Sequence, residues 1–196
     1  MHLGVKMSKI IKEVISTLSV IKNLDSTEIN GTREIVNRQA NFFPHRTDLE
    51  DERKQVALFY QNNIGDWQAR CDLERNHYKF LRAFIIHKIG EVLYFHRQES
   101  MTSRKFVIWS NDCISCIQFL HREEGSTINI FIRSSDVLNL LPCDYLFGCE
   151  LLDEILAEFN LPANDNDAVC FFTTSSHYYL KDEAKVEKIL YGALND

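Results

Sequence analysis

Two alternating runs separated by a short acidic turn constrain the fold more than any other feature of this sequence. Apolar and polar residues alternate over residues 113–121 and again over 128–132, with Glu123-Glu124-Gly125 between the two runs. Alternation with a period of two is typical of a half-buried strand. A glycine-containing turn between two such runs predicts a β-hairpin in the second half of the chain.

The remaining periodicity adds helices and further strands around this hairpin. Apolar residues three and four positions apart predict helices at residues 10–18, 51–60, 145–159 and 184–194. Short β-branched and aromatic runs predict strands at 106–109 and 169–173, and Asn30-Gly31 predicts a turn. The apolar segment 80–96 fits either a helix or a buried strand. Because strands and helices mix without strict β-α-β alternation, we expect an α+β fold, and the lack of repeats and linkers predicts one domain over residues 1–196.

Composition excludes several classes of protein. The net charge of −6 argues against an extended nucleic-acid surface, although a local basic cluster that holds one phosphate remains possible. No apolar run has the length of a signal peptide or of a membrane span, so we expect no membrane association and a cytoplasmic location. The 6 cysteines are expected to be reduced thiols, because a chain of 196 residues needs no disulfides to hold its core.

Cys113 and Cys116 form a Cys-x-x-Cys pair, which alone suggests a zinc or redox site. A zinc site needs further ligands at suitable spacing, and no second pair is present. We therefore predict no metal site. The other four cysteines and both tryptophans are predicted to be packing residues: Cys71, Cys143, Cys149, Cys170, Trp67 and Trp109.

The stretch 113–144 combines a cysteine with Arg133-Ser134-Ser135-Asp136 and Leu141-Pro142-Cys143-Asp144. It resembles the thymidylate synthase family, including its pyrimidine-nucleotide hydroxymethylase branch. In that family a nucleophilic cysteine begins a strand, a hairpin follows, and Arg-Ser-x-Asp ends its second strand. A helix then begins with Gly-Leu-Pro-Phe-Asn or a variant of it, and the spacing from Cys113 to Asp144 fits this pattern without an insertion.

Three shorter segments extend the resemblance. His177 and Tyr179 stand where the family has Gly-Asp-x-His-x-Tyr, with Ser175 in place of its aspartate. Ser103-Arg104-Lys105 looks like the family's Ser-Arg-Arg, and Arg33 after the Asn30-Gly31 turn resembles its N-terminal phosphate-loop arginine. The match lies mainly over residues 103–179.

The resemblance implies a thymidylate-synthase-like mixed β-sheet with flanking helices, one face of which packs in a two-fold homodimer. It implies one-carbon transfer from 5,10-methylenetetrahydrofolate to C5 of a pyrimidine nucleotide monophosphate, with Cys113 adding to C6. A thiolate suits this step because it is a strong nucleophile and leaves again easily. Arg133 is the cation expected to lower the pKa of Cys113.

The implied binding residues surround that cysteine. Arg133 and Ser134 would hold the 5′-phosphate, with Arg33, Arg104 and Lys105 adding contacts, the last two across the dimer. His177 and Tyr179 would bind the sugar hydroxyl, and Gln118 would support the nucleotide from behind. Asp136 is expected near the base and the folate. The glutamate that organises water in the family has three candidates here, Glu52, Glu74 and Glu91.

Asp144 is the residue that discriminates between bases. Synthases that act on uracil carry Asn at this position, whereas the branch that uses cytosine nucleotides carries Asp. A carboxyl group can accept from the cytosine amino group and, when protonated, donate to N3, so we expect dCMP or CMP and favour hydroxymethylation over methylation. Asp144 could also serve as the N-cap of the following helix.

Two other functions remain open from the sequence. The chain could be a catalytically altered relative that binds a nucleotide or a protein partner without folate chemistry, since the family's folate-closing segment has no counterpart here. A folate-independent reaction on the same nucleotides, such as C5 proton exchange or dehalogenation, is a third hypothesis. Arg133 and Asp136 could likewise be an ordinary surface ion pair.

Overall fold

The computed structural model describes residues 7–23, 26–42, 49–65, 67–95 and 100–193. The elements in chain order are α1 (Lys9–Asn23), β1 (Thr27–Ile29), β2 (Thr32–Phe42), α2 (Leu49–Asn63), α3 (Trp67–Phe95), β3 (Val107–Trp109), β4 (Ile114–Arg122), β5 (Gly125–Asp136), α4 (Leu141–Glu158), β6 (Ala168–Tyr179), a 3-10 turn (Leu180–Asp182) and α5 (Glu183–Ala193). None of the described helices is long and apolar enough to cross a membrane.

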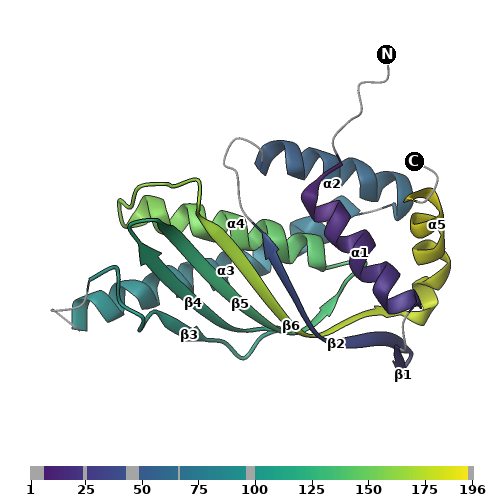
Figure 1. The fold of residues 1–196 in the computed structure, drawn as a ribbon, viewed down its shortest axis with the longest axis horizontal. Helices are drawn as coiled ribbons and strands as arrows, with labels where there is room; N and C mark the ends of the chain where they lie inside the picture. The colour runs from purple at the N-terminus through teal and green to yellow at the C-terminus, as the bar shows by residue number, and fades with distance from the viewer. Residues whose placement is uncertain (1–6, 24–25, 43–48, 66, 96–99, 194–196) are drawn as a thin grey trace, which may run out of the picture.

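Six strands form one mixed sheet in the order β1-β2-β6-β5-β4-β3 (Figure 1). All neighbours are antiparallel except β5 and β6, which run parallel and are joined by the crossover helix α4. The predicted hairpin is confirmed, with β4 and β5 paired as far as Arg122 opposite Gly125. A mixed sheet flanked by helices agrees with the predicted α+β class.

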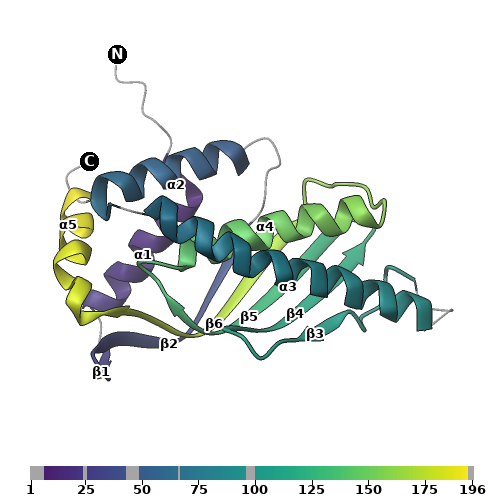
Figure 2. The ribbon, with the colours of Figure 1, turned by 180° about the vertical axis from the view of Figure 1, so that it is seen from behind.

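The core lies between the sheet and its helices. Ile128, Ile130 and Ile132 of β5 are fully buried, whereas Phe131 between them is 39% exposed, so one face of the strand is covered and the other is open. Figure 2 shows α3 crossing in front of β4 and β5, and in Figure 1 the same helix passes behind them. We call the side of the sheet away from the helices the open face.

The alternation of buried residues changes phase midway along two neighbouring strands. In β5 the buried side chains follow every second position up to Ile132 and then resume at Ser135. In β6 they follow every second position up to Thr173 and resume at Ser176. Ile132 pairs with Thr173 and Ser135 with Ser176, so both strands change phase at one level without slipping in register.

A break in β4 lies at the same level. The register shifts between Ile114 and Cys116, which pair with Ile132 and Phe131. Irregularities of this kind bend a strand and redirect its side chains. Figure 1 shows β6 turning midway along its length toward α5. The sheet therefore bends along one line, which we call the kink.

Most of the sequence-predicted elements are confirmed. Several of them are longer than predicted, whereas β3 is one residue shorter. The ambiguous segment 80–96 is helical over its described residues 80–95 within α3, whose 29 residues far exceed the length of a strand. The strand predicted at 169–173 continues to Tyr179 as β6. β1 and β2 were not predicted, because their polar-rich sequence carries little periodicity, but the turn between them has positive φ at Asn30 and Gly31 as expected for a tight hairpin.

Gly148 of α4 allows the helix to approach the sheet closely. A Cβ at this position would lie 2.7 Å from Phe171 Cζ and 2.8 Å from Val169 Cγ1. We expect Gly148→Ala to lower the free energy of unfolding by about 1–3 kcal/mol through overpacking. Gly90→Ala in α3 is the matched control, because a Cβ there meets nothing within 4 Å, and it should stabilise by roughly 0.5–1 kcal/mol. Equal urea midpoints for the two variants would contradict this account of the packing.

Candidate functional site

Cys113 lies immediately before β4, at the level of the kink, and its side chain is exposed. Its carbonyl accepts a hydrogen bond of 2.8 Å from the backbone N–H of Arg133, so these two residues face each other across the hairpin. Arg133 is exposed and makes no ion pair with the described residues, Asp136 included. The alternative of an Arg133–Asp136 surface pair is therefore not observed.

Burial disfavours the thiolate form of three other cysteines. Burial raises the pKa of the thiols of Cys116, Cys149 and Cys170, which keeps them protonated near neutral pH. Cys143 and Cys149 are buried as predicted, and Cys170 is half-buried. The side chain of Cys71 lies outside the described residues. No group of three or more potential metal ligands is found among the residues that the structure describes.

Ser134, His177 and Tyr179 form a polar cluster on the open face beyond the kink. Ser134 Oγ lies 3.3 Å from His177 Nδ1, and the rings of His177 and Tyr179 meet edge to face at 5.6 Å. His177 pairs directly with Asp136 of β5. The structure thus brings together three residues that the sequence analysis assigned to nucleotide binding, next to Asp136, which it expected near the base and the folate.

Glu34 belongs to this cluster and was missed by the sequence analysis. It pairs directly with His177 from β2, and Ser175 Oγ donates a 2.5 Å hydrogen bond to its Oε2. Ile35, its neighbour, packs on the core side, so Glu34 points toward the open face. The Asn30-Gly31 turn fixes the register of β2. Glu34 could have been placed beside His177 from the sequence only if residues 32–42 had been recognised as a strand. We call Glu34, Ser134, Ser175, His177 and Tyr179 the open-face cluster.

Asp136 shapes the turn that leads into α4. Its two carboxylate oxygens accept hydrogen bonds from the backbone N–H of Asn139 at 3.1 Å and from Asn139 Nδ2 at 2.7 Å. Its side chain is only 7% exposed. The carboxylate is therefore a structural acceptor at the start of the helix, next to the open-face cluster.

Asp144 is buried in the first turn of α4, with 5% of its surface exposed. Its Oδ2 accepts a 3.1 Å hydrogen bond from Ser135 Oγ, and its Oδ1 accepts one from the Tyr78 hydroxyl of α3. The helix begins at Leu141 with Leu140 in the N-cap position, so the suggestion that Asp144 is the N-cap is wrong. The helix instead begins one turn earlier than predicted, with Pro142 in its first turn and the Asp136–Asn139 hydrogen bonds just ahead of it.

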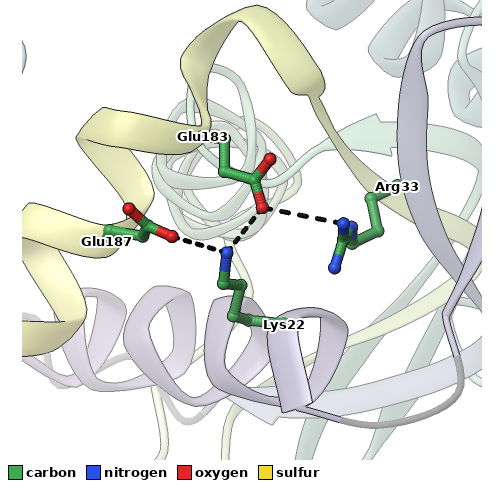
Figure 3. Close-up of polar contacts among 4 residues, drawn as sticks. All are labelled: Lys22, Arg33, Glu183 and Glu187. Carbon is green, nitrogen blue, oxygen red and sulfur yellow. Dashed lines mark hydrogen bonds and ion pairs between the residues drawn. The ribbon is translucent and has the colours of Figure 1, made fainter.

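Arg33 lies on the core side of β2, on the opposite face from Glu34. Its guanidinium is 3.7 Å from Glu183 Oε1, which also accepts a 2.5 Å hydrogen bond from Lys22 (Figure 3). Glu187 binds the same lysine at 2.8 Å. The structure does not bring Arg33 together with the open-face cluster, and its role toward phosphate stays a prediction.

Gln118, Arg104 and Lys105 also lie apart from the cluster. Gln118 is on the open face of β4, where its Oε1 accepts a 3.3 Å hydrogen bond from Asn129. Arg104 and Lys105 are exposed and precede β3, at the opposite end of that strand from the segment leading to Cys113. Within one chain, neither basic residue approaches Cys113 along the strand.

A groove runs between α3 and the edge strand β3. Its volume is about 290 Å³, and it is lined by Phe84, Lys88, Glu91, Val92, Val107, Ile108 and Trp109. Trp109 is 73% exposed, so the prediction that it is a packing residue is wrong. The reason is that β3 is an edge strand whose outward positions have no neighbouring layer. The side chain of Trp67 lies outside the described residues.

The candidate glutamates for water organisation have different surroundings. Glu52 accepts hydrogen bonds from Ser8 Oγ and from the backbone N–H groups of Lys9 and Ile10, so it caps α1. Glu91 lines the groove and bonds Lys88 at 2.5 Å, which lowers the pKa of its carboxyl group. The side chain of Glu74 lies outside the described residues.

A cross-strand row of apolar side chains occupies the open face on the near side of the kink. Trp109 pairs with Cys116, Cys116 with Phe131, and Phe131 with Phe172. The rings of Phe131 and Phe172 stack at 4.8 Å.

Comparison with known proteins found no relative. No protein-family model matches this chain, and no curated protein does.

The ion pairs of Glu183 give a test of the fold near Arg33. The hydrogen bond from Lys22 lowers the pKa of the Glu183 carboxyl group. A lowered pKa in the folded state adds stability above the unfolded pKa, and this is lost as pH falls through the folded value. We expect Glu183→Gln to cost at most about 1 kcal/mol at pH 7, because the pair is partly exposed, and to cost progressively less as the pH falls through the lowered pKa of Glu183. Urea unfolding at neutral and acidic pH measures this, and a cost that stays the same in acid would contradict it.

Proposed function

We propose that this protein transfers a one-carbon unit to C5 of a pyrimidine nucleotide, with cytosine nucleotides and hydroxymethylation favoured. The observation that carries the proposal is the position of exposed Cys113 directly opposite Arg133, the residue before Ser134 of the open-face cluster. A site that adds a thiolate to a nucleotide base requires a nucleophile, a cation for the phosphate and polar groups for the sugar. In this proposal these groups lie along one line of the sheet.

The chemistry begins with the Cys113 thiolate. Its sulfur adds to C6 of the pyrimidine, and the electron pair of the C5–C6 double bond makes C5 nucleophilic. C5 would form a bond to the methylene carbon of the folate and lose its proton, and the N–CH2 bond would then break, so that tetrahydrofolate leaves and an exocyclic methylene remains at C5. Water would add to this methylene while the sulfur is still on C6. The sulfur then leaves C6 as the C5–C6 double bond re-forms, which gives the hydroxymethyl product.

The neighbouring residues hold the nucleotide. Arg133 and Ser134 bind the 5′-phosphate, and a guanidinium suits this task because it offers paired N–H donors. His177 and Tyr179 bind the sugar hydroxyl. Asp136 positions the turn beneath the base through Asn139 rather than by reacting itself.

Asp144 is proposed to read the cytosine edge because of its place in the resemblance. It is buried on the helix side of the sheet, where Ser135 Oγ and the Tyr78 hydroxyl donate to its two oxygens. The phosphate and sugar groups lie on the open face, so the base has to pass the C-terminal end of β5 to reach Asp144. A carboxylate oxygen can accept a second hydrogen bond, so the cytosine amino group can donate to Asp144 beside the Tyr78 hydroxyl.

The residues of the α3–β3 groove fit a folate in their chemistry. Trp109 offers an exposed ring for a flat pterin or aminobenzoyl group. Lys88 lies 5.7 Å over the Phe84 ring and bonds Glu91, so it would have to turn from both to reach the carboxylate tail of the folate. Methylenetetrahydrofolate supplies a methylene group at the oxidation level of formaldehyde when bound. Glu91 lines the same groove and is the glutamate proposed to orient water, although its carboxylate also pairs with Lys88 and His87.

A two-fold homodimer through the open face is part of the proposal. The row of Trp109, Cys116, Phe131 and Phe172 leaves large apolar side chains uncovered, and Trp109 and Phe131 are 73% and 39% exposed. A contiguous set of exposed aromatic groups on one face of a sheet is typical of an interaction surface. An isologous dimer covers the row with its own copy, and Arg104 and Lys105 then reach the partner's phosphate.

The second candidate function is nucleotide binding without folate chemistry. Two observations favour it: Glu52 is engaged in capping α1, and Asp144 is engaged by Tyr78. A family relative that had lost catalysis would keep the phosphate and sugar groups while its catalytic carboxylates took structural roles.

Release of tritium from C5 of labelled CMP, dCMP and dUMP tests the enzyme proposal. With methylenetetrahydrofolate present, we expect release from a cytosine nucleotide, and Cys113→Ser should reduce it by about 10³-fold or more. Cys170→Ser is the control and should retain activity. Release from dUMP alone would keep the enzyme and overturn the role of Asp144. Nucleotide binding without any release would favour the second function.

Phe131→Glu tests the dimer. A charge at the centre of the cross-strand row should convert a dimer into a monomer, as measured by sedimentation velocity at micromolar concentration. Leu58→Glu is the control, because Leu58 is 59% exposed on α2 and lies outside the open face. A wild-type chain that is monomeric under these conditions would contradict the shared phosphate site.

A further inference from the structure

Glu34 and His177 place two different hydrogen-bonding groups side by side on the open face. They are direct partners in the antiparallel pairing of β2 and β6, and such residues have Cβ atoms about 4.5–5.5 Å apart. One side chain is an acceptor when ionised, and the other has a ring nitrogen on each side. Together they are spaced to meet two neighbouring hydroxyl groups.

Each of these side chains is anchored through one atom only. Ser175 holds Glu34 by Oε2, and Ser134 holds His177 by Nδ1. Within the described part of the chain, Glu34 Oε1 and His177 Nε2 have no other hydrogen-bond partner. The anchored atoms fix the orientation of both groups, and the remaining atoms are available to a ligand.

We propose that Glu34 makes this site selective for a ribose over a deoxyribose. The inference rests on the proposed function, in which His177 and Tyr179 bind the 3′-hydroxyl of a nucleotide. The 2′-hydroxyl of a ribose adjoins the 3′-hydroxyl on the same side of the sugar ring. Glu34 Oε1 accepts a hydrogen bond from the 2′-hydroxyl while His177 Nε2 engages the 3′-hydroxyl.

The negative charge of Glu34 explains why the site favours ribose over deoxyribose. A hydroxyl that donates to a carboxylate makes a charge-assisted hydrogen bond, which is stronger than one between neutral groups. A deoxyribose leaves Glu34 without that donor, and a site built to bind a hydroxyl discriminates against the analogue that lacks it. The substrate class is therefore a pyrimidine ribonucleotide such as CMP.

Ser175 holds the Glu34 carboxylate in place from the neighbouring strand. In the family that the sequence resembles, an aspartate stands at this position, and here a serine donates to a carboxylate from the neighbouring strand instead. The negative charge is kept, but it is carried by β2 rather than by β6. Its placement opposite His177 is what allows it to reach the second hydroxyl.

Titration calorimetry of the full chain with CMP, dCMP and the arabinose analogue of CMP tests the inference. We expect CMP to bind about 10- to 100-fold more tightly than dCMP. The arabinose analogue should bind no better than dCMP, because its 2′-hydroxyl points to the other side of the ring. Glu34→Leu should bring the affinities for CMP and dCMP close together by weakening CMP binding alone.

The controls separate this inference from the proposed function. Glu28→Leu removes a carboxylate from an exposed position of β1 and should keep the preference for CMP. If Glu34→Leu fails to fold, Glu34→Gln must still reduce the preference, because it keeps an acceptor for Ser175 but not the charge. Equal binding of CMP and dCMP to the wild-type chain, or tighter binding of dCMP, would overturn the inference and leave the proposed function standing. Binding of no nucleotide would overturn both.

Discussion

The shared kink of the sheet is the constraint on which the rest of the site depends. Because β5 and β6 change phase together, the residues beyond Ile132 and Thr173 exchange faces while their pairing is preserved. Ser134 and His177 therefore emerge on the open face, where regular strands would have turned them toward the helices. The register shift in β4 lies at the same level and sets the exposed position of Cys113.

Helix α4 secures this geometry from the other side of the sheet. Gly148 allows close contact with Val169 and Phe171, and the ring of Tyr145 meets that of Phe171 edge to face at 4.5 Å. At its start, the helix holds β5 through the hydrogen bond from Ser135 to Asp144. Packing and polar contacts thus converge on the stretch of β5 where the strand changes face.

Sequence periodicity predicted the hairpin and four helices, because apolar spacing carries a clear signal there. It could not place β2, whose residues 32–34 are polar and bury little, and Glu34 was missed with it. The extension of β6 was missed for the same reason, since residues 174–177 are Thr, Ser, Ser and His. Family resemblance supplied Ser134, His177 and Tyr179, which the fold brings together, but also Arg33, which the fold turns toward Glu183. No single-sequence pattern reveals which face a residue takes beyond a kink.

Protection of Cys113 from alkylation is the most direct test of the central claim, that this thiol and the open-face cluster form one nucleotide site. Peptide mass spectrometry after iodoacetamide treatment, with and without saturating CMP, would follow Cys113 and Cys170 in one sample. The account predicts that CMP slows alkylation of Cys113 and leaves Cys170 unchanged. Alkylation of Cys113 at the same rate in both conditions would contradict it.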